Sequence, residues 1–107
     1  MPVYNKLVRD RIPEIIEKSG KKFTVETLDH DRYVLEMKKK LTEELKEYHE
    51  TANNDEALEE LADMLELIYS LAEVHGGTIE ELEQIRKQKA EKRGGFKKKL
   101  FLIEVED

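Results

Sequence analysis

The sequence predicts an all-α fold organised around a helical hairpin, on three observations. Charged residues make up 41% of the 107 residues and aromatic residues only 7%, which is typical of helices with extensive solvated faces. Apolar residues recur at three- and four-residue steps, the spacing of one helix face. A polar break at residues 51–54 separates the two longest patterns of this kind, and short connections join antiparallel helices.

The size and charge of the chain bound its class. A length of 107 residues supports a single domain, residues 1–107, rather than two. The absence of cysteine excludes disulfides and thiolate chemistry. A net charge of −6 argues against a nucleic-acid partner, because an acidic surface repels phosphates. No apolar run approaches about 18 residues and the first residues lack a signal-peptide core, so we expect no membrane partner and a cytoplasmic location.

The first helix is short and follows a basic segment. Asp10 is the expected N-cap, Pro13 lies in the first turn, where its missing N–H costs nothing, and Gly20 ends the helix. Three cations precede it: Lys6, Arg9 and Arg11. Cations near a helix N-terminus could hold phosphate. The alternative is a solvated basic tail that makes surface ion pairs.

Two segments outside the helices have strand character. Residues 23–28 are β-branched and partly alternating, which predicts a brief strand or extended connector. Residues 100–105 form a mostly apolar run that resembles a second short strand, able to pair with the first. Phe96, after the helix break at residues 94–95, is expected to pack back into the core.

The first long helix is expected over about residues 32–50, with Asp31 as its N-cap. At about 100° per residue, Glu44 lies at the edge of the apolar stripe and Glu47 nearer to solvent. Glu43 lies further round and is expected to be exposed. The stripe itself consists of Val34, Met37, Leu41, Leu45 and Tyr48.

The second long helix, about residues 56–75 with Asp55 as its expected cap, is apolar nearly all round. Such a helix is central, and one of its faces must meet another subunit or another long helix. Glu60 points into an apolar sector, where a carboxylate is costly unless it is paired or binds a metal. Asp63 lies next to it, toward the polar edge. One apolar face comprises Leu58, Leu61, Ala62, Leu65, Ile68, Tyr69 and Ala72. The second, on which the expected dimerisation rests, comprises Met64, Leu67 and Leu71.

The last helix is expected to begin at the capping box Thr78 to Glu81 and to end at Gly94. Its second half is a run of charged residues, which usually forms a solvated face. Lys89 and Arg93 are four residues apart on one side of the helix, so they could also clamp an anion.

Two carboxylate pairs at i,i+3 spacing carry the chemistry: Glu44 with Glu47, and Glu60 with Asp63. Residues three apart share one helix face, so a hairpin would set one pair against the other. Four carboxylates held together repel one another unless a cation lies between them. The same spacing also arises by chance in helices rich in glutamate, lysine and leucine.

The ligand set favours Mg²⁺, with Mn²⁺ as a substitute. A ferritin-like di-iron site requires Glu-x-x-His pairs, and zinc requires histidine or cysteine ligands, neither of which the acidic cluster offers. Carboxylate oxygens on helices suit Mg²⁺ or Mn²⁺, which also contact substrate phosphates. With basic residues toward both ends of the chain, this arrangement supports metal-assisted attack of water on a phosphoanhydride.

Three segments also carry a resemblance to a known family. The pattern Glu43-Glu44-x-x-Glu47 followed by Glu60-x-x-Asp63 resembles the EExxE…ExxD signature of the MazG-like all-α nucleoside triphosphate pyrophosphohydrolases. Residues 4–16, YNKLVRDRIPEII, and residues 92–96, KRGGF, resemble a small house-cleaning subgroup predicted to clear noncanonical nucleotides.

The resemblance implies a helical hairpin whose flanking helices form a four-helix-bundle core completed by dimerisation, as a homodimer or dimer of dimers. It implies hydrolysis of an NTP or dNTP to the monophosphate and pyrophosphate. Glu43, or one of the metal ligands, would orient or deprotonate the attacking water, and Lys89 and Arg93 match a basic KxxxR pattern. The implied Mg²⁺ ligands are Glu44, Glu47, Glu60 and Asp63.

Two other functions fit parts of the same pattern. The fold could serve as a non-catalytic helical dimerisation or nucleotide-binding module. The substrate could instead be phosphoribosyl-ATP, whose hydrolase shares the acidic-helix plan, although the N-terminal segment fits that enzyme poorly.

Overall fold

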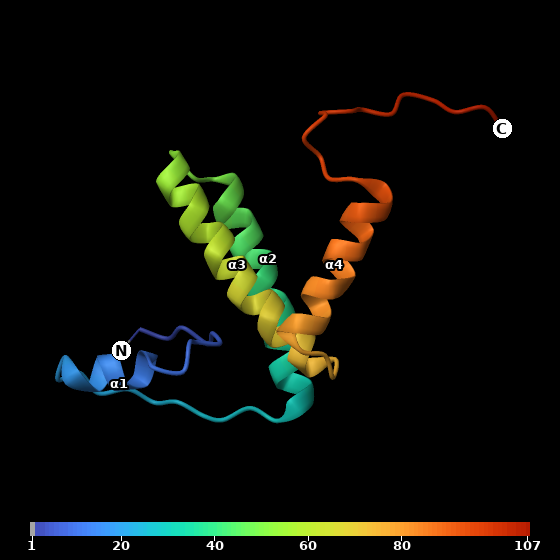
Figure 1. The fold of residues 1–107 in the computed structure, drawn as a ribbon. Helices are drawn as coiled ribbons and strands as arrows, with labels where there is room; N and C mark the ends of the chain where they lie inside the picture. The colour runs from blue at the N-terminus through green and yellow to red at the C-terminus, as the bar shows by residue number, and fades with distance from the viewer. Residues whose placement is uncertain (1) are drawn as a thin grey trace.

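The structure is a computed structural model that describes residues 2–107. It contains four helices, and within this range it has no strand, so the all-α class is confirmed. The helices α2 and α3 lie side by side as an antiparallel hairpin, while α1 and α4 diverge from it (Figure 1). The helices are α1 Ile12–Lys18, α2 His30–His49, α3 Asn54–Val74 and α4 Ile79–Arg93.

The N-caps of both hairpin helices lie two residues before the expected ones. The Asp29 side chain accepts a hydrogen bond from the Arg32 N–H at 2.9 Å, and Asn53 accepts one from Glu56 at 2.9 Å. An N-cap residue needs an extended backbone, which Asp29 and Asn53 have. Asp31 and Asp55, which were the expected caps, lie instead in the first helical turns. There their negative charge interacts favourably with the positive end of the helix dipole.

The remaining helix ends differ in how they are capped. At α4 the Thr78 hydroxyl accepts the Glu81 N–H at 3.0 Å, which confirms the predicted start. In α1 the N-cap is Arg11 rather than Asp10, without a side-chain hydrogen bond, and Pro13 lies in the first turn as expected. Short and sparsely capped, α1 depends on its surroundings for stability.

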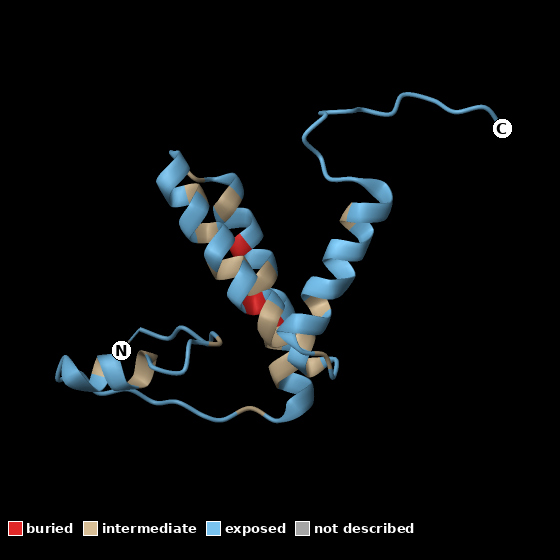
Figure 2. Ribbon diagram, viewed as in Figure 1, coloured by how far each residue is buried: buried red, intermediate tan, exposed pale blue. Residues whose placement is uncertain are grey.

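The hairpin contains all the buried side chains that the structure describes. Figure 2 shows them on α2 and α3, and they are Met37, Glu44 and Leu67. Leu67 is buried and Met64 and Leu71 are half-buried, so this sector of α3 faces the interior of the hairpin. Glu60 lies in the same sector, as its angular position predicted.

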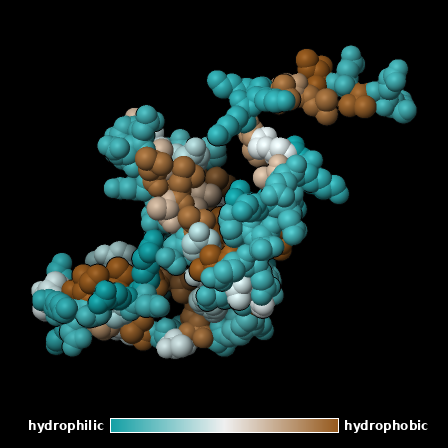
Figure 3. All heavy atoms as spheres, viewed as in Figure 1, coloured by the Kyte–Doolittle hydropathy of each residue, from teal (hydrophilic) through white to brown (hydrophobic). Residues whose placement is uncertain are grey.

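The other apolar face of α3 is open to solvent. Its side chains are between 37% and 64% exposed, and apolar atoms cover this part of the hairpin in Figure 3. The residues are Leu58, Leu61, Leu65 and Ile68, which we call the open α3 face. The hairpin therefore satisfies one of the two apolar faces of α3 and leaves the other without a partner inside the chain.

A single chain exposes far more surface than a compact domain of its size. Its accessible surface is 10217 Å² for a mass of 12.6 kDa, whereas a compact monomer of that mass exposes about 6,200 Å². Its radius of gyration is 18.4 Å, against about 13 Å for a compact domain of this length. The excess is about 4,000 Å² per chain, more than most interfaces bury.

The flanking helices do not complete a four-helix bundle within one chain; the bundle expected from the resemblance is one that dimerisation completes. Among residues 2–107, α4 packs only against α3, and α1 packs against none of the other helices. The helix α1 is only seven residues long, and the turn after α3, in which Gly76 has a φ of +80°, leads into a helix α4 that diverges from the hairpin (Figure 1). One chain supplies a hairpin, not four packed helices.

The two predicted strands are also absent from the described chain. Residues 23–28 and 100–105 are extended but lie at opposite ends of the molecule, so neither has a strand to pair with (Figure 1). Phe96 does not pack into the core either, since it is 96% exposed. Gly94, with φ of +84°, directs the following segment away from the helices.

None of the helices between residues 2 and 107 combines the length and the apolarity needed to cross a bilayer.

Candidate metal site

Three glutamates converge between the two helices of the hairpin. Glu44 and Glu47 come from consecutive turns of α2, and Glu60 comes from the facing side of α3. One carboxylate oxygen of each lies within 4.8 Å of the other two. The hairpin thus brings the predicted pair Glu44 and Glu47 on one helix together with Glu60 on the other. This cluster could hold a metal ion.

Burial and hydrogen bonding distinguish this cluster from an ordinary acidic surface. Glu44 is only 8% exposed, and its Oε2 atom is buried without a hydrogen-bond partner. Oε2 of Glu60 is buried and unpartnered as well. Buried carboxylate oxygens are almost always paired, because leaving them without a partner costs free energy. A divalent cation is the partner that this set of oxygen ligands fits.

The remaining predicted exposures agree with the structure. Glu44 lies at the edge of the core, and Glu47 is exposed on the next turn. Glu43 is exposed and is not part of the cluster of three.

The environment of Glu44 favours its protonated form. Its pKa is raised from 4.5 to about 8, first because burial removes water from the carboxylate. A proton on Glu44 can be shared with Glu60, a contact that two ionised carboxylates cannot make, and this sharing and the negative charges of Glu47, Glu60 and Asp63 raise the pKa further. Without a cation, Glu44 therefore stays protonated up to a pH of about 8, which reduces the negative charge of the cluster.

This shift predicts how the stability of the metal-free protein depends on pH. Between pH 4.5 and about 8 the folded chain keeps a proton on Glu44 that the unfolded chain has lost. The free energy of unfolding should therefore fall as the pH rises through this window. Thermal unfolding in a chelator at several pH values measures it, with Glu44→Gln as the control. The glutamine variant should show a flatter profile, and identical profiles would refute the role of Glu44.

Asp63, the fourth expected ligand, is engaged elsewhere. Its Oδ1 lies 2.8 Å from the Arg9 Nη2 atom, and Glu66 lies 4.0 Å from the same guanidinium. Both side chains of the Arg9–Asp63 pair are about half exposed, and such pairs contribute at most about 1 kcal/mol. The pair is therefore weak enough for Asp63 to exchange Arg9 for a metal ion at small cost.

Arg9 brings the N-terminal segment over the hairpin and forms one wall of a cleft. The cleft has a volume of about 290 Å³ and is open to solvent on one side. It leads from Arg9 down to the buried Glu44, so a ligand in it would contact the acidic cluster and cations together. The residues that line it are Val8, Arg9, Ile12, Lys40, Glu44, Asp63, Glu66 and Leu67.

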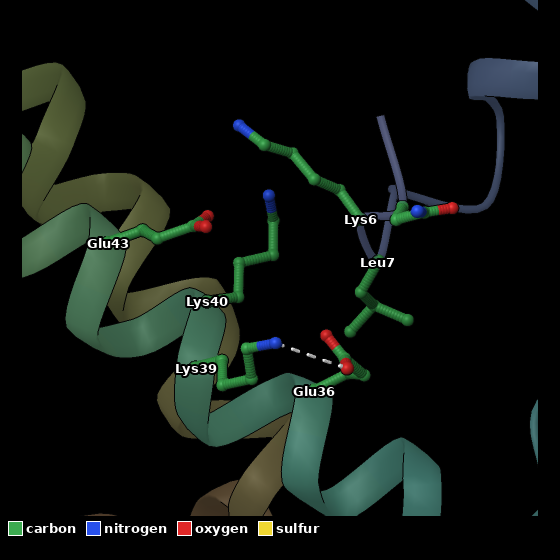
Figure 4. A pocket seen from close by; sticks show the side chains of 7 residues that line it. Lys6, Leu7, Glu36, Lys39, Lys40 and Glu43 are labelled. Atoms are coloured by element: carbon green, nitrogen blue, oxygen red, sulfur yellow. Dashed lines mark ion pairs between the residues drawn. The ribbon is translucent and has the colours of Figure 1, made fainter. Parts of the chain in front are cut away.

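A second, smaller recess of about 30 Å³ lies beside the cleft. Figure 4 shows the side chains of Lys6 and Lys40 and the carboxylate of Glu43 pointing toward the same space. Lys39 is instead paired with Glu36 at 3.5 Å. Lys40 lines both the recess and the cleft, so the two share this cation.

Lys40 is the site residue that the sequence analysis missed. It lies four residues before Glu44, so both side chains share one face of α2. That spacing was visible in the sequence. Its significance was overlooked because Lys38 and Lys39 precede Lys40, and a run of three lysines is typical of a solvated face.

Three of the predicted phosphate-binding residues are not at the site within this chain. Arg11 lies 3.7 Å from Glu14 of its own helix and lines neither recess nor cleft. Lys89 and Arg93 lie on the second half of α4, which diverges from the hairpin (Figure 1). Of the five predicted cations, Arg9 lines the cleft and Lys6 lines the recess beside Glu43.

Comparison with known proteins adds one partial relative. An uncharacterized protein of Mycolicibacterium smegmatis is 45% identical over 53 residues, which cover 50% of this chain and 54% of that protein. The chain therefore spans about half the length of this relative. No protein-family model matches the chain, and no solved structure does.

Proposed function

We propose that the protein is a Mg²⁺-dependent nucleoside triphosphate pyrophosphohydrolase. The observation that carries this proposal is the pair of buried, unpartnered carboxylate oxygens of Glu44 and Glu60 beside Glu47. An oxygen-only cluster of this kind suits Mg²⁺ or Mn²⁺. The adjoining cleft places two cations, Arg9 and Lys40, among the carboxylates Glu44, Asp63 and Glu66, so a bound metal ion is needed before it can attract a triphosphate. The MazG-like pattern of the sequence supports the same reaction.

Each residue near the cleft has a role in this proposal. Glu44, Glu47 and Glu60 would hold the ion, and Asp63 would join them on leaving Arg9. A bound divalent ion supplies Lewis-acid polarisation of the phosphoanhydride and lowers the pKa of water. Arg9, Lys6 and Lys40 would bind phosphate oxygens, and Glu43 at the rim would orient or deprotonate the attacking water. Water attack then yields a nucleoside monophosphate and pyrophosphate.

We further propose that the working form is a homodimer, or a dimer of dimers. The excess surface of about 4,000 Å² per chain and the open α3 face both support association. Two hairpins would supply four long helices, which is the number that a bundle core requires. In such an assembly Lys89 and Arg93 could approach the cleft of the other copy, although they lie away from the cleft of their own.

The reaction can be tested by measuring pyrophosphate and monophosphate from a panel of standard and modified NTPs and dNTPs, with and without Mg²⁺. We expect both products in equal amounts, only with the metal, and faster turnover of noncanonical nucleotides. Phosphoribosyl-ATP belongs in the same panel, because its hydrolysis would identify the alternative substrate. Release of inorganic phosphate and a nucleoside diphosphate would contradict the proposed site of cleavage.

The second candidate function is a non-catalytic dimerisation or nucleotide-binding module. The observation that favours it is the absence of Lys89 and Arg93 from the cleft within the chain. This function predicts that Mg²⁺ and nucleotide together raise the melting temperature while no product forms. The panel distinguishes the two functions directly.

Lys40 provides a prediction about substrate binding. In Lys40→Met we expect the KM for a nucleoside triphosphate to rise about tenfold or more, because a charge-assisted contact to phosphate is lost. The value of kcat should change little, as expected when substrate and transition state lose the same contact. Lys38→Met is the matched control, since Lys38 is exposed on α2 and lines neither the recess nor the cleft. Equal KM values in the two variants would refute the role of Lys40.

A further inference from the structure

The C-terminal segment is apolar, extended and exposed. Six large side chains within ten residues are between 73% and 96% exposed, and the segment stands clear of the helices in Figures 1 and 3. We call residues 96–107 the C-terminal arm. Its exposed apolar residues are Phe96, Leu100, Phe101, Leu102, Ile103 and Val105. Such a concentration of exposed apolar surface marks a site of association.

The backbone of the arm also lacks partners. Within the described chain, no backbone hydrogen bond involves residues 100–107. The same is true of residues 21–28, the extended link between α1 and α2. Both segments have strand-forming composition, with three β-branched residues in 23–28 and an apolar run in 100–103. An extended segment with unpaired backbone N–H and C=O groups readily accepts a strand from another chain.

The charges of the two segments are complementary in one orientation. The arm begins with Lys97 to Lys99 and ends with Glu104, Glu106 and Asp107. Residues 21–28 begin with Lys21 and Lys22, and Glu26 and the adjoining Asp29 lie toward their other end. An antiparallel pairing sets each basic end against an acidic end, whereas a parallel pairing sets like charges together. Opposite charges across a strand pair are stabilising and like charges are destabilising.

Pairing within one chain is unfavourable on length. The helix α4 has 15 residues and is therefore about 22 Å long. It carries Gly94 away from the end of the hairpin where residues 23–28 lie (Figure 1). From Gly94 to Leu100 an extended chain reaches at most about 22 Å. The chain from Gly94 to Leu100 would therefore be fully extended in running back along α4, with no length left to reach residues 23–28.

We propose that the arm pairs antiparallel with residues 21–28 of a second copy of this chain. A two-fold symmetric dimer forms this contact twice, so each copy gives one arm and receives one. Pairing of the two arms with each other also joins opposite charges, but it leaves residues 21–28 of both copies unpaired. Because a two-stranded ribbon alone is only marginally stable, the exchange supplements contact between the hairpins. The exchange would bury part of the surface that the single chain exposes in excess of a compact domain.

The absence of native cysteine allows a direct test by crosslinking of the full-length chain. Val25→Cys and Ile103→Cys are purified separately, denatured, refolded together and treated with a short bismaleimide. We expect severalfold more covalent dimer from the mixture than from either variant alone. A mixture of Lys38→Cys and Ile103→Cys is the matched control and should give only the background level. Thr24→Cys with Leu102→Cys provides a second pair, in case one of the first variants fails to fold.

Three outcomes would overturn the proposal. Covalent dimer from Ile103→Cys alone, at the level of the mixture, would mean that arms pair with arms. In a chain that carries both Val25→Cys and Ile103→Cys, an internal crosslink without covalent dimer would mean that the arm pairs within its own chain. A dimer by sedimentation that gives no crosslink with either cysteine pair would refute strand exchange. The inference rests on the proposed association of two copies and not on the reaction, so the substrate panel and this experiment fail independently.

Discussion

In Glu60→Gln we expect pyrophosphate release to fall by at least about 100-fold. Removing an outer-shell partner of a metal ligand typically costs 10–100-fold, and Glu60 is proposed as a direct ligand. Its Oε2 is one of the two buried oxygens without a partner. A glutamine amide keeps the volume but cannot supply the negative charge. Steady-state release at saturating Mg²⁺ measures the effect.

The matched control is Glu59→Gln, one residue earlier on the same helix. Glu59 is exposed and is not part of the glutamate cluster, so its neutralisation changes net charge equally and should leave turnover within about twofold. Circular dichroism of both variants checks that α3 remains folded. Equal activity in the two variants would show that the carboxylate of Glu60 has no part in catalysis.

In Leu65→Asp we expect loss of self-association together with a large fall in melting temperature. Leu65 is 45% exposed at the centre of the open α3 face. Burying one leucine contributes about 1.5–3 kcal/mol, and a two-fold interface counts it twice. The dissociation constant should therefore rise by more than about 100-fold. Sedimentation velocity at micromolar concentration measures the change.

Val3→Asp is the control for this variant. Val3 is 77% exposed and lies outside all four helices, so the same change from an apolar to an acidic residue should leave association intact. A monomeric wild-type chain would contradict the proposed dimer outright. A Leu65→Asp variant that associates as tightly as the wild type would place the interface on another surface.

The angular position of residues on the hairpin helices could be predicted from sequence, because a helix fixes it. Glu44 at the edge of the core, Glu60 in an apolar sector and Glu47 in solvent all follow from about 100° per residue. The capping of α4 by Thr78 is equally local. These predictions needed no knowledge of what lies opposite each face.

What failed were predictions that depend on contacts between distant residues. Asp63 pairs with Arg9, 54 residues earlier, and no local pattern encodes that contact. The strands at residues 23–28 and 100–105 were inferred from composition, which cannot tell whether a partner strand lies within reach. The packing of Phe96 failed for the same reason, since one left-handed glycine before it sets its direction.

The faces of α3 are an intermediate case. The sequence analysis assigned the subunit contact to the face of Met64, Leu67 and Leu71, but that face packs inside the hairpin. In the structure Leu67 is buried inside the hairpin and Leu58 and Leu65 face solvent. The choice depends on how α2 packs against α3, and the buried Met37 and Glu44 show which side of α2 faces inward.

Titration of Mn²⁺ into the metal-free protein, followed by electron paramagnetic resonance of the free ion, tests the central claim most directly. We predict that Mn²⁺ binds at the glutamate cluster, that Mg²⁺ displaces it, and that Glu59→Gln binds as the wild type does. In Glu60→Gln the affinity should fall by at least about 100-fold. No binding at millimolar Mn²⁺, or binding that Glu60→Gln leaves unchanged, would contradict a metal site between α2 and α3.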